Sequence, residues 1–484
     1  MLKERVKSSV IVILIFNLIF LTAQLWFVNS TNSLGESIYK YIRENPLVER
    51  FFPIEPKYSI SKENLSLPRK LLINDGSLWM VYYNTDRGFA PIEVRTRDLI
   101  KAFLQGDVTA TKKIDQNTWE AGLESLSIYV EYPVEFSSEM FCKIMGVDSS
   151  KVPEGIKSLR EFIIIPSSDE SDICILTRGN DESDIYAHIL KKSYNLPASD
   201  LAVYTNADGY YQPAFSTGLE LSENSNVSLD PLVLFSDSQP ATQTLAPHNL
   251  IITNSKGKLL ENFGFNYEAT PYKDSQGALK YIANYASATI YPDSVFEYNA
   301  VSEERGILLD ESGDSYNVLN ASIDFAEKVW GSVSDEPLSI LVSSDLSNYS
   351  SSRPYTFKFD YYLNGRPIKV DIEGSAGHEK MTSAIEITVK GGRLISYRQY
   401  MRSYETVSTQ TISETFIAAL DYFVSVIDAQ SQAPTVIEDI YIGYLDSGDS
   451  ANLSASWLSK TDDGKIFCYR EESLISADLE VSGE

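Results

Sequence analysis

Residues 1–30 constrain this chain more than any other part of its sequence. An apolar run extends from Val10 to Val28, close to the roughly 20 residues that a helix needs to cross a bilayer core. Three cationic side chains precede the run: Lys3, Arg5 and Lys7. Cations concentrate on the cytoplasmic side of membrane helices. We therefore expect a single-pass protein of the cell membrane, with Met1 in the cytoplasm and nearly the whole chain outside.

A cleaved secretory signal is the alternative for this segment, because it has the same order of basic, apolar and polar regions. Signal peptides usually have a shorter apolar core of about 7–15 residues that ends in a small-x-small site. This run is longer and ends in the bulky sequence Leu25-Trp26-Phe27, which favours an uncleaved anchor. A lipoprotein is excluded, since the first cysteine of the chain is Cys142.

Composition indicates a folded ectodomain with an acidic surface. The chain has 484 residues, 43% hydrophobic and 12% aromatic, which leaves room for two to four domains. A net charge of −26 repels phosphate backbones, so nucleic acid is excluded as a partner. Only 3 cysteines are present, too few and too scattered for a disulfide framework.

We expect an α+β fold in which each ectodomain has an antiparallel sheet with packed helices. Prolines interrupt residues 31–65, which we interpret as a juxtamembrane spacer. Polar residues Ser222–Ser228 mark a boundary, because nothing in that run favours burial. The predicted units are an N-terminal α+β domain (66–221), a middle α+β domain (229–318) and a C-terminal α+β domain (319–484).

Local patterns in the N-terminal and middle segments predict individual elements. Asn74-Asp75-Gly76 predicts a hairpin between strands 70–73 and 79–83, and Pro133 is expected to end a strand that begins at Ile128. Ser137 or Ser138 is expected to cap a short helix that runs through Met145. We also expect helices at 96–105 and 117–126, paired strands at 162–165 and 173–177, and a helix near 278–285.

The C-terminal segment gives the clearest periodicity, with a helix followed by strands in each of two halves. Asn320 is expected to cap the first helix and Thr411-Ile412-Ser413-Glu414 to open the second. Between them, aromatic and polar residues alternate over 355–361, Asn364-Gly365 turns the chain, and a second alternation follows over 385–390. This pattern predicts an antiparallel meander with one face in water.

Signatures of chemistry are missing from the sequence, so we expect no catalytic residues, no cofactor and no metal. The three histidines, His188, His248 and His378, lie far apart in sequence. His378-Glu379 begins like a zinc-protease helix, but Thr382 stands where the second imidazole ligand would be needed. No phosphate-binding glycine loop and no dinucleotide fingerprint occur. The protein is therefore not expected to be an enzyme.

Two amides give the membrane segment a possible binding role. Asn17 and Gln24 are seven residues apart, which places them about 20° apart on one face of a helix. Amides in hydrocarbon form hydrogen bonds across helix interfaces that can be worth about 1 kcal/mol. The alternative is a helix that simply tolerates both groups. Trp26 fits an interfacial anchor, so Asn17, Gln24 and Trp26 are the candidate interface residues.

Several stretches resemble one known family. They are Lys3–Lys7 with Leu21–Trp26, Ile128–Pro133, Ile290–Asp293 and Tyr361–Gly365. Together they resemble YycH-type proteins, membrane-anchored accessory regulators of an essential cell-wall sensor histidine kinase in Gram-positive bacteria, and the last stretch is similar to the sister protein YycI. The resemblance implies one membrane helix, an ectodomain made of three α+β domains, no catalytic residues, and association with the kinase and a YycI-like protein. The spacer and the acidity depart from the family pattern.

The sequence thus favours a regulator that acts by protein contacts through its membrane helix and ectodomain. Two other classes stay open: an anchored cell-wall-processing enzyme, and a module that binds wall polymer or peptide on the exposed sheet.

Overall fold

A computed structural model of the chain describes residues 60–469 except 77–78, 84–87, 167–171, 180–183, 192, 195, 197–200, 202–210, 218–220, 222–224, 237–240, 251–255, 267–269, 375–376 and 432. The chain divides into two compact units, Met1–Ser59 and Ile60–Glu484, and every described residue belongs to the second. The predicted membrane segment therefore lies outside the described residues. Within the described ranges, no helix is long and apolar enough to cross a bilayer.

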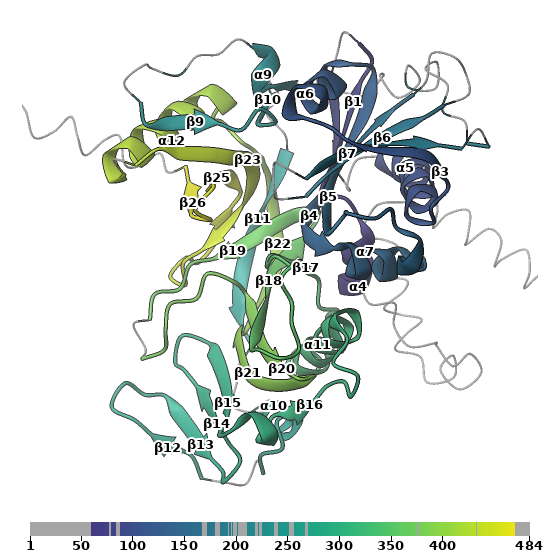
Figure 1. Cartoon of the computed structure of the whole chain (residues 1–484). Helices are drawn as coiled ribbons and strands as arrows, with labels where there is room; N and C mark the ends of the chain where they lie inside the picture. Colours follow the sequence, from purple (N-terminus) through teal and green to yellow (C-terminus); the bar gives the residue numbers. More distant parts are fainter. Residues whose placement is uncertain are drawn as a thin grey trace, which may run out of the picture. The chain divides into compact units, whose positions relative to one another are not determined.

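An antiparallel sheet with strand order β2-β1-β4-β5-β6-β7-β3 forms the N-terminal part (Figure 1). Its strands are β1 (Lys70–Asn74), β2 (Trp79–Tyr83), β3 (Val108–Lys113), β4 (Ser127–Ser137), β5 (Ser158–Ile165), β6 (Cys174–Arg178) and β7 (Ile185–Leu190). The accompanying helices are α4 (Ile60–Ser66), α5 (Phe89–Leu104), α6 (Gln116–Glu124), α7 (Ser138–Met145) and the 3-10 helix η1 (Ser149–Lys151).

Helices cover both faces of this sheet, because β4 and β5 carry apolar residues toward each side. One face packs against α5 and α7 through Val130, Phe162, Phe103 and Phe141. The other face packs against α6 through Tyr129, Ile163, Trp119 and Leu123. The predicted hairpin between β1 and β2 is confirmed, as is the Ser137 side chain that caps α7 by accepting from the Met140 N–H.

Short elements follow and lead into the rest of the chain. They are β8 (Tyr211–Pro213), α9 (Ala214–Thr217), β9 (Val227–Leu229), β10 (Leu234–Ser236), β11 (Ala241–Asn249) and α10 (Lys256–Asn262). Strand β10 pairs with β8, and β9 adds in parallel to β23. Strand β11 forms a long antiparallel ribbon with β22 and also pairs with β24.

A larger sheet occupies the remaining part, with the main order β12-β13-β14-β15-β21-β20-β18-β19-β23-β25-β26. Its first strands are β12 (Tyr272–Lys273), β13 (Leu279–Ile282), β14 (Ala286–Ile290), β15 (Val295–Ala300), β16 (Ile307–Leu308), β17 (Ile340–Val342), β18 (Tyr355–Leu363) and β19 (Arg366–Val370). The later strands of this part are β20 (Ile385–Lys390), β21 (Arg393–Tyr400), β22 (Arg402–Thr411), β23 (Thr435–Asp446), β24 (Leu453–Ser454), β25 (Ser456–Thr461) and β26 (Ile466–Cys468). Its helices are η2 (Glu303–Arg305), α11 (Ser315–Trp330) and α12 (Phe416–Gln430).

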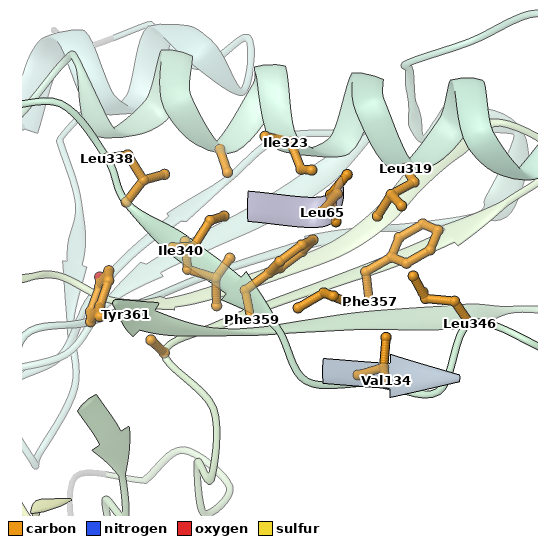
Figure 2. Close-up of a cluster of buried hydrophobic side chains, with 14 of the residues drawn as sticks. Leu65, Val134, Leu319, Ile323, Leu338, Ile340, Leu346, Phe357, Phe359 and Tyr361 are labelled. Atoms are coloured by element: carbon orange, nitrogen blue, oxygen red, sulfur yellow. The ribbon is translucent and has the colours of Figure 1, made fainter. Parts of the chain in front are cut away.

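A buried apolar cluster joins elements that lie far apart in the sequence. Figure 2 shows side chains of α11, β17 and β18 packed together with Leu65 of α4 and Val134 of β4. Phe357 and Phe359 of β18 are almost completely buried there. Helix α4 occupies the last residues of the predicted spacer, and it belongs to this core. Its Ser61 hydroxyl and Asn64 amide donate to the carbonyl oxygens of Leu338 and Ile340, both at 3.1 Å.

Four predictions about element boundaries are wrong. Pro133 does not end its strand, because β4 shifts register against β5 between Glu131 and Phe136 and needs no N–H donor there. Residues 278–285 are not helical, since β13 pairs with β14 instead. Helix α11 is capped by Asp314 rather than Asn320, and α12 by Thr415 rather than by the Thr411 box. In both helices the cap is the residue directly before the first helical residue, and its side-chain oxygen accepts from N–H groups of the first turn.

Candidate functional site

The larger sheet has one apolar face and one polar face, as its alternating residues predict. Tyr298 and Tyr397 point to the apolar face, where their rings lie 5.0 and 5.3 Å from that of Phe263, just after α10. Their neighbours in β15 and β21 therefore point to the opposite face: Glu297, Asn299, Ser396 and Arg398. The predicted meander with one wet face is confirmed: burial alternates along all of β20, over residues 356–359 of β18 and over residues 396–399 of β21.

Strand pairing arranges the polar side chains in rows across this face. One row aligns Glu297 of β15, Arg398 of β21 and Glu386 of β20. The next row aligns Asn299, Ser396 and Thr388 on the same strands. Arg398 is thus the cross-strand neighbour of both Glu297 and Glu386, and charges and hydrogen-bonding groups from three strands share one surface.

A pocket of about 270 Å³ lies on this polar face. It is lined by Tyr291, Glu297, Asn299, Gly377, His378, Glu379, Ser396 and Arg398. A bridge between Ile372 and Met381 closes the loop that carries Gly377, His378 and Glu379. The pocket therefore lies between the strands of the sheet and a loop fixed at both ends.

Glu297 is held in place by neutral hydrogen-bond donors. The Tyr291 hydroxyl donates to its Oε2 at 3.0 Å, and the Asn299 amide donates to its Oε1 at 2.5 Å. Burial raises the pKa of Tyr291, and the neighbouring charge of Glu297 raises it further, so the phenol keeps its proton and donates it. Ser396 in turn donates to the Asn299 Oδ1 at 2.7 Å. Its cross-strand neighbour Arg398 pairs with Glu386, and among the described residues no ion pair within 4.0 Å involves the Glu297 carboxylate.

His378 and Arg398 fix the overlying loop instead. His378 is buried, with Nε2 2.7 Å from Asp293 Oδ2 and Nδ1 2.7 Å from the Glu379 carbonyl oxygen. Both ring nitrogens are therefore engaged with oxygen atoms of the protein. Arg398 donates to Glu386 at 3.0 Å and to the Glu379 carbonyl oxygen at 2.5 Å. Neither side chain is free to act as a general base at the pocket.

The other two histidines lie elsewhere. His188 is buried in the N-terminal sheet between the hydroxyls of Thr111 and Thr177, at 3.0 and 3.1 Å. Burial lowers its pKa to about 4, so the ring is neutral. His248 lies on β11, 3.5 Å from Glu405 and largely exposed. Within the described residues, no group of three or more His, Cys, Asp or Glu could hold a metal ion.

A buried ion network lies where the N-terminal sheet meets β23. Glu131 of β4 contacts three cations, Arg69 at 2.5 Å, Lys70 at 3.0 Å and Arg160 at 3.1 Å. Arg69 also pairs with Asp439 of β23. Burial raises the pKa of the Glu131 carboxyl, but the three cations outweigh burial and lower that pKa well below its usual range. This network connects two sheets and is not a pocket.

Sequence reasoning found only part of this arrangement. His378 was singled out and lies in the pocket, but as a group that fixes the loop. Glu297, Asn299, Ser396 and Arg398 were missed, because the pairing of β15 with β21 joins segments about a hundred residues apart, as the register of Glu297 with Arg398 shows. The candidate interface residues Asn17, Gln24 and Trp26 lie outside the described residues, so their role stays a prediction.

Comparison with known proteins identifies the fold. No family model matches the sequence, and no curated protein matches it. The solved structure of YycH from Bacillus subtilis matches with a TM-score of 0.55 and 13% identity, over 86% of this chain and 98% of that chain. An uncharacterized protein from Eubacterium rectale matches with a TM-score of 0.33 and 10% identity, over 51% of this chain and 87% of that one. The chain therefore has a YycH-like α+β fold.

Proposed function

We propose that this protein is a membrane-anchored extracytoplasmic regulator that modulates a sensor histidine kinase controlling cell-wall metabolism. The observation that carries the proposal is the match to YycH, which includes 98% of that chain. The N-terminal sequence supports it independently, because Lys3–Lys7 and the apolar run up to Val28 are typical of a membrane anchor with a cytoplasmic N-terminus. A YycI-like protein is the proposed second partner.

Such a regulator acts through binding alone. It shifts a kinase between signalling states only if it binds those states with different affinity. A tenfold shift needs a difference of about 1.4 kcal/mol, which one or two hydrogen bonds across a membrane interface can supply. The proposed protein therefore needs no catalytic residues of its own.

We propose that Asn17 and Gln24 contribute to this difference from one face of the membrane helix. Trp26 then lies at the outer interface and fixes the depth of the helix. Thr22 provides an internal comparison, since five residues from Asn17 place it about 140° away around the helix. Replacing it changes polarity in the same segment without touching the proposed interface.

Co-purification tests the proposal. The full-length protein is expressed with a sensor histidine kinase of the same organism and isolated in mild detergent, together with the Asn17→Leu/Gln24→Leu double variant and the Thr22→Leu control. We expect the wild type and the control to retain the kinase and the double variant to lose most of it. Equal retention by all three would reject the membrane-helix contact. Absence of kinase from the wild-type sample would count against the regulator itself.

An activity assay on the same protein preparation distinguishes the proposed regulator from a wall-processing enzyme. Turnover of purified peptidoglycan that a single carboxylate substitution abolishes would favour a wall-processing enzyme. Under the proposed function, the protein leaves peptidoglycan unchanged.

A further inference from the structure

The Glu297 carboxylate combines two properties that rarely occur together. It is partly buried and held by two neutral donors, and among the described residues no ion pair within 4.0 Å involves it. It also lines a pocket. We propose that this pocket binds a primary ammonium group, supplied by a lysine-like side chain or by the amino terminus of a peptide. The proposal does not depend on the kinase, because it concerns the pocket alone.

Charge around the pocket favours a cation. The lining contains two carboxylates, the half-buried Glu297 and the exposed Glu379, and neither forms an ion pair within 4.0 Å among the described residues. The two basic side chains of the lining already contact other carboxylates, Arg398 that of Glu386 and His378 that of Asp293. The Arg398 Nε has no hydrogen-bond partner, but it is buried, so an anion entering the pocket would meet the two carboxylates before it could reach this nitrogen. A cation would supply the missing partner of Glu297 in a partly buried site, where such pairs are stronger than in water.

Hydrogen-bonding geometry favours an ammonium over other cations. A primary ammonium has three donors and no acceptor. The pocket offers acceptor capacity on neighbouring groups, namely the remaining lone pairs of the Glu297 carboxylate and the second lone pair of the Asn299 carbonyl. A divalent metal prefers several carboxylate or imidazole ligands, and the described residues hold no such group.

The volume of the pocket limits how much of the ligand can enter together with the ammonium group. Pockets for drug-sized ligands measure about 300–1,000 Å³, and this pocket of about 270 Å³ is just below that range. It therefore accepts one charged group with a short aliphatic chain, while the rest of the ligand lies outside along the polar rows of the sheet.

Titration calorimetry with three peptides tests the inference on the full-length protein in non-ionic detergent. The first is acetyl-Ala-Lys-Ala-amide, whose ammonium is on a side chain. The second is Ala-Ala-amide, whose ammonium is at the amino terminus. The third is acetyl-Ala-norleucine-Ala-amide, which has nearly the shape of the first without the charge. We expect at least one of the two cationic peptides to bind, and that one identifies the source, whereas the norleucine peptide does not bind.

Two variants and one control locate the binding. Glu297→Gln keeps the size of the side chain but removes the charge, and is expected to weaken binding at least tenfold. Glu379→Lys places a competing cation at the exposed rim and is expected to weaken binding similarly, while its backbone carbonyl keeps the contacts with His378 and Arg398. Glu304→Gln changes an exposed carboxylate on η2 outside the pocket and should leave binding unchanged. Thermal unfolding of each variant verifies the fold.

Three results would overturn the inference. They are failure of both cationic peptides to bind the wild type, equal binding of the lysine and norleucine peptides, and unchanged affinity in a folded Glu297→Gln variant. The kinase test is unaffected by all three, so failure of one proposal is distinguishable from failure of the other.

Discussion

At the scale of single residues, the ion network around Glu131 stabilises the protein because each buried charge in it is compensated by the others. The carboxylate is 4% exposed and contacts Arg69, Lys70 and Arg160. Removing one partner of a buried ion pair costs about 3–5 kcal/mol, because the other charges stay buried and uncompensated. We expect Glu131→Gln to lower the free energy of unfolding by about that amount, measured by urea titration. Glu373→Gln, which breaks an exposed contact with Lys380, is the control and should change little.

Asp230 gives a second residue-scale prediction, on pH. Burial raises its pKa from 3.8 to about 6, so the folded state holds this proton more tightly than the unfolded state does. Its contribution to stability is therefore complete below about pH 4 and is lost as the pH rises through about 6. The Asp230→Asn variant has no carboxyl group to ionise at this position, so its stability does not fall as the pH rises through about 6. We expect the variant to gain roughly 1–3 kcal/mol relative to wild type between pH 4 and pH 7, measured by urea titration at both values.

His188 titrates in the same pH window with the opposite sign. Burial lowers its pKa from 6.5 to about 4, so the unfolded state binds this proton more tightly. Its contribution is complete above about pH 6.5 and is lost as the pH falls through about 4. We expect His188→Asn, whose amide can still bond to Thr111 or Thr177, to be less sensitive to acid than wild type between pH 6.5 and pH 4. A difference from wild type that stays constant over this range would contradict the prediction.

At the scale of elements, periodicity in the sequence predicted what is local and missed what is not. The alternation of Phe357 and Phe359 with polar neighbours was enough to predict β18 and its buried face. Nothing local places Glu297 beside Arg398, because strand pairing depends on the whole sheet. The predictions at Pro133 and at residues 278–285 were wrong for the same reason, because strand pairing decided the structure against the local sequence preference. At Pro133 the strand continues through a register shift, and within residues 278–285 β13 pairs with β14. The fold class was therefore predictable and the pocket was not.

Helix α4 supplies the element-scale prediction. It has 7 residues, too few for a stable isolated helix, so its structure depends on packing against β17. Leu65 is buried, and Ser61 and Asn64 donate to carbonyl oxygens at Leu338 and Ile340. We expect Ser61→Ala/Asn64→Ala to increase amide hydrogen exchange in α4 at least tenfold while exchange in α6 stays unchanged. Glu63→Ala, at an exposed position of the same helix, is the control and should not increase exchange in this way.

At the scale of the whole molecule, one buried cluster contains residues from Leu65 to Ala455. It includes side chains from all three predicted ectodomains, and polar contacts cross between them as well. Arg69 pairs with Asp439, and the Leu346 N–H donates to the Glu135 carbonyl oxygen at 2.8 Å. The boundaries at 221 and 318 stay a prediction. What can be tested is whether the segments they separate unfold independently.

A single cooperative transition is the outcome that this shared core predicts, because no segment can lose its packing without exposing the others. Calorimetry of the full-length protein should then show one main transition for the described part of the chain between residues 60 and 469. Three variants, one in each predicted domain, should lower that same transition: Glu131→Gln, Phe296→Leu and Phe357→Leu. Each removes a buried interaction worth at least about 1 kcal/mol, enough to shift a melting temperature measurably. Separate transitions, each shifted by only one variant, would instead support three independently folding domains, and a ligand or partner bound at one of them would then leave the stability of the others unchanged.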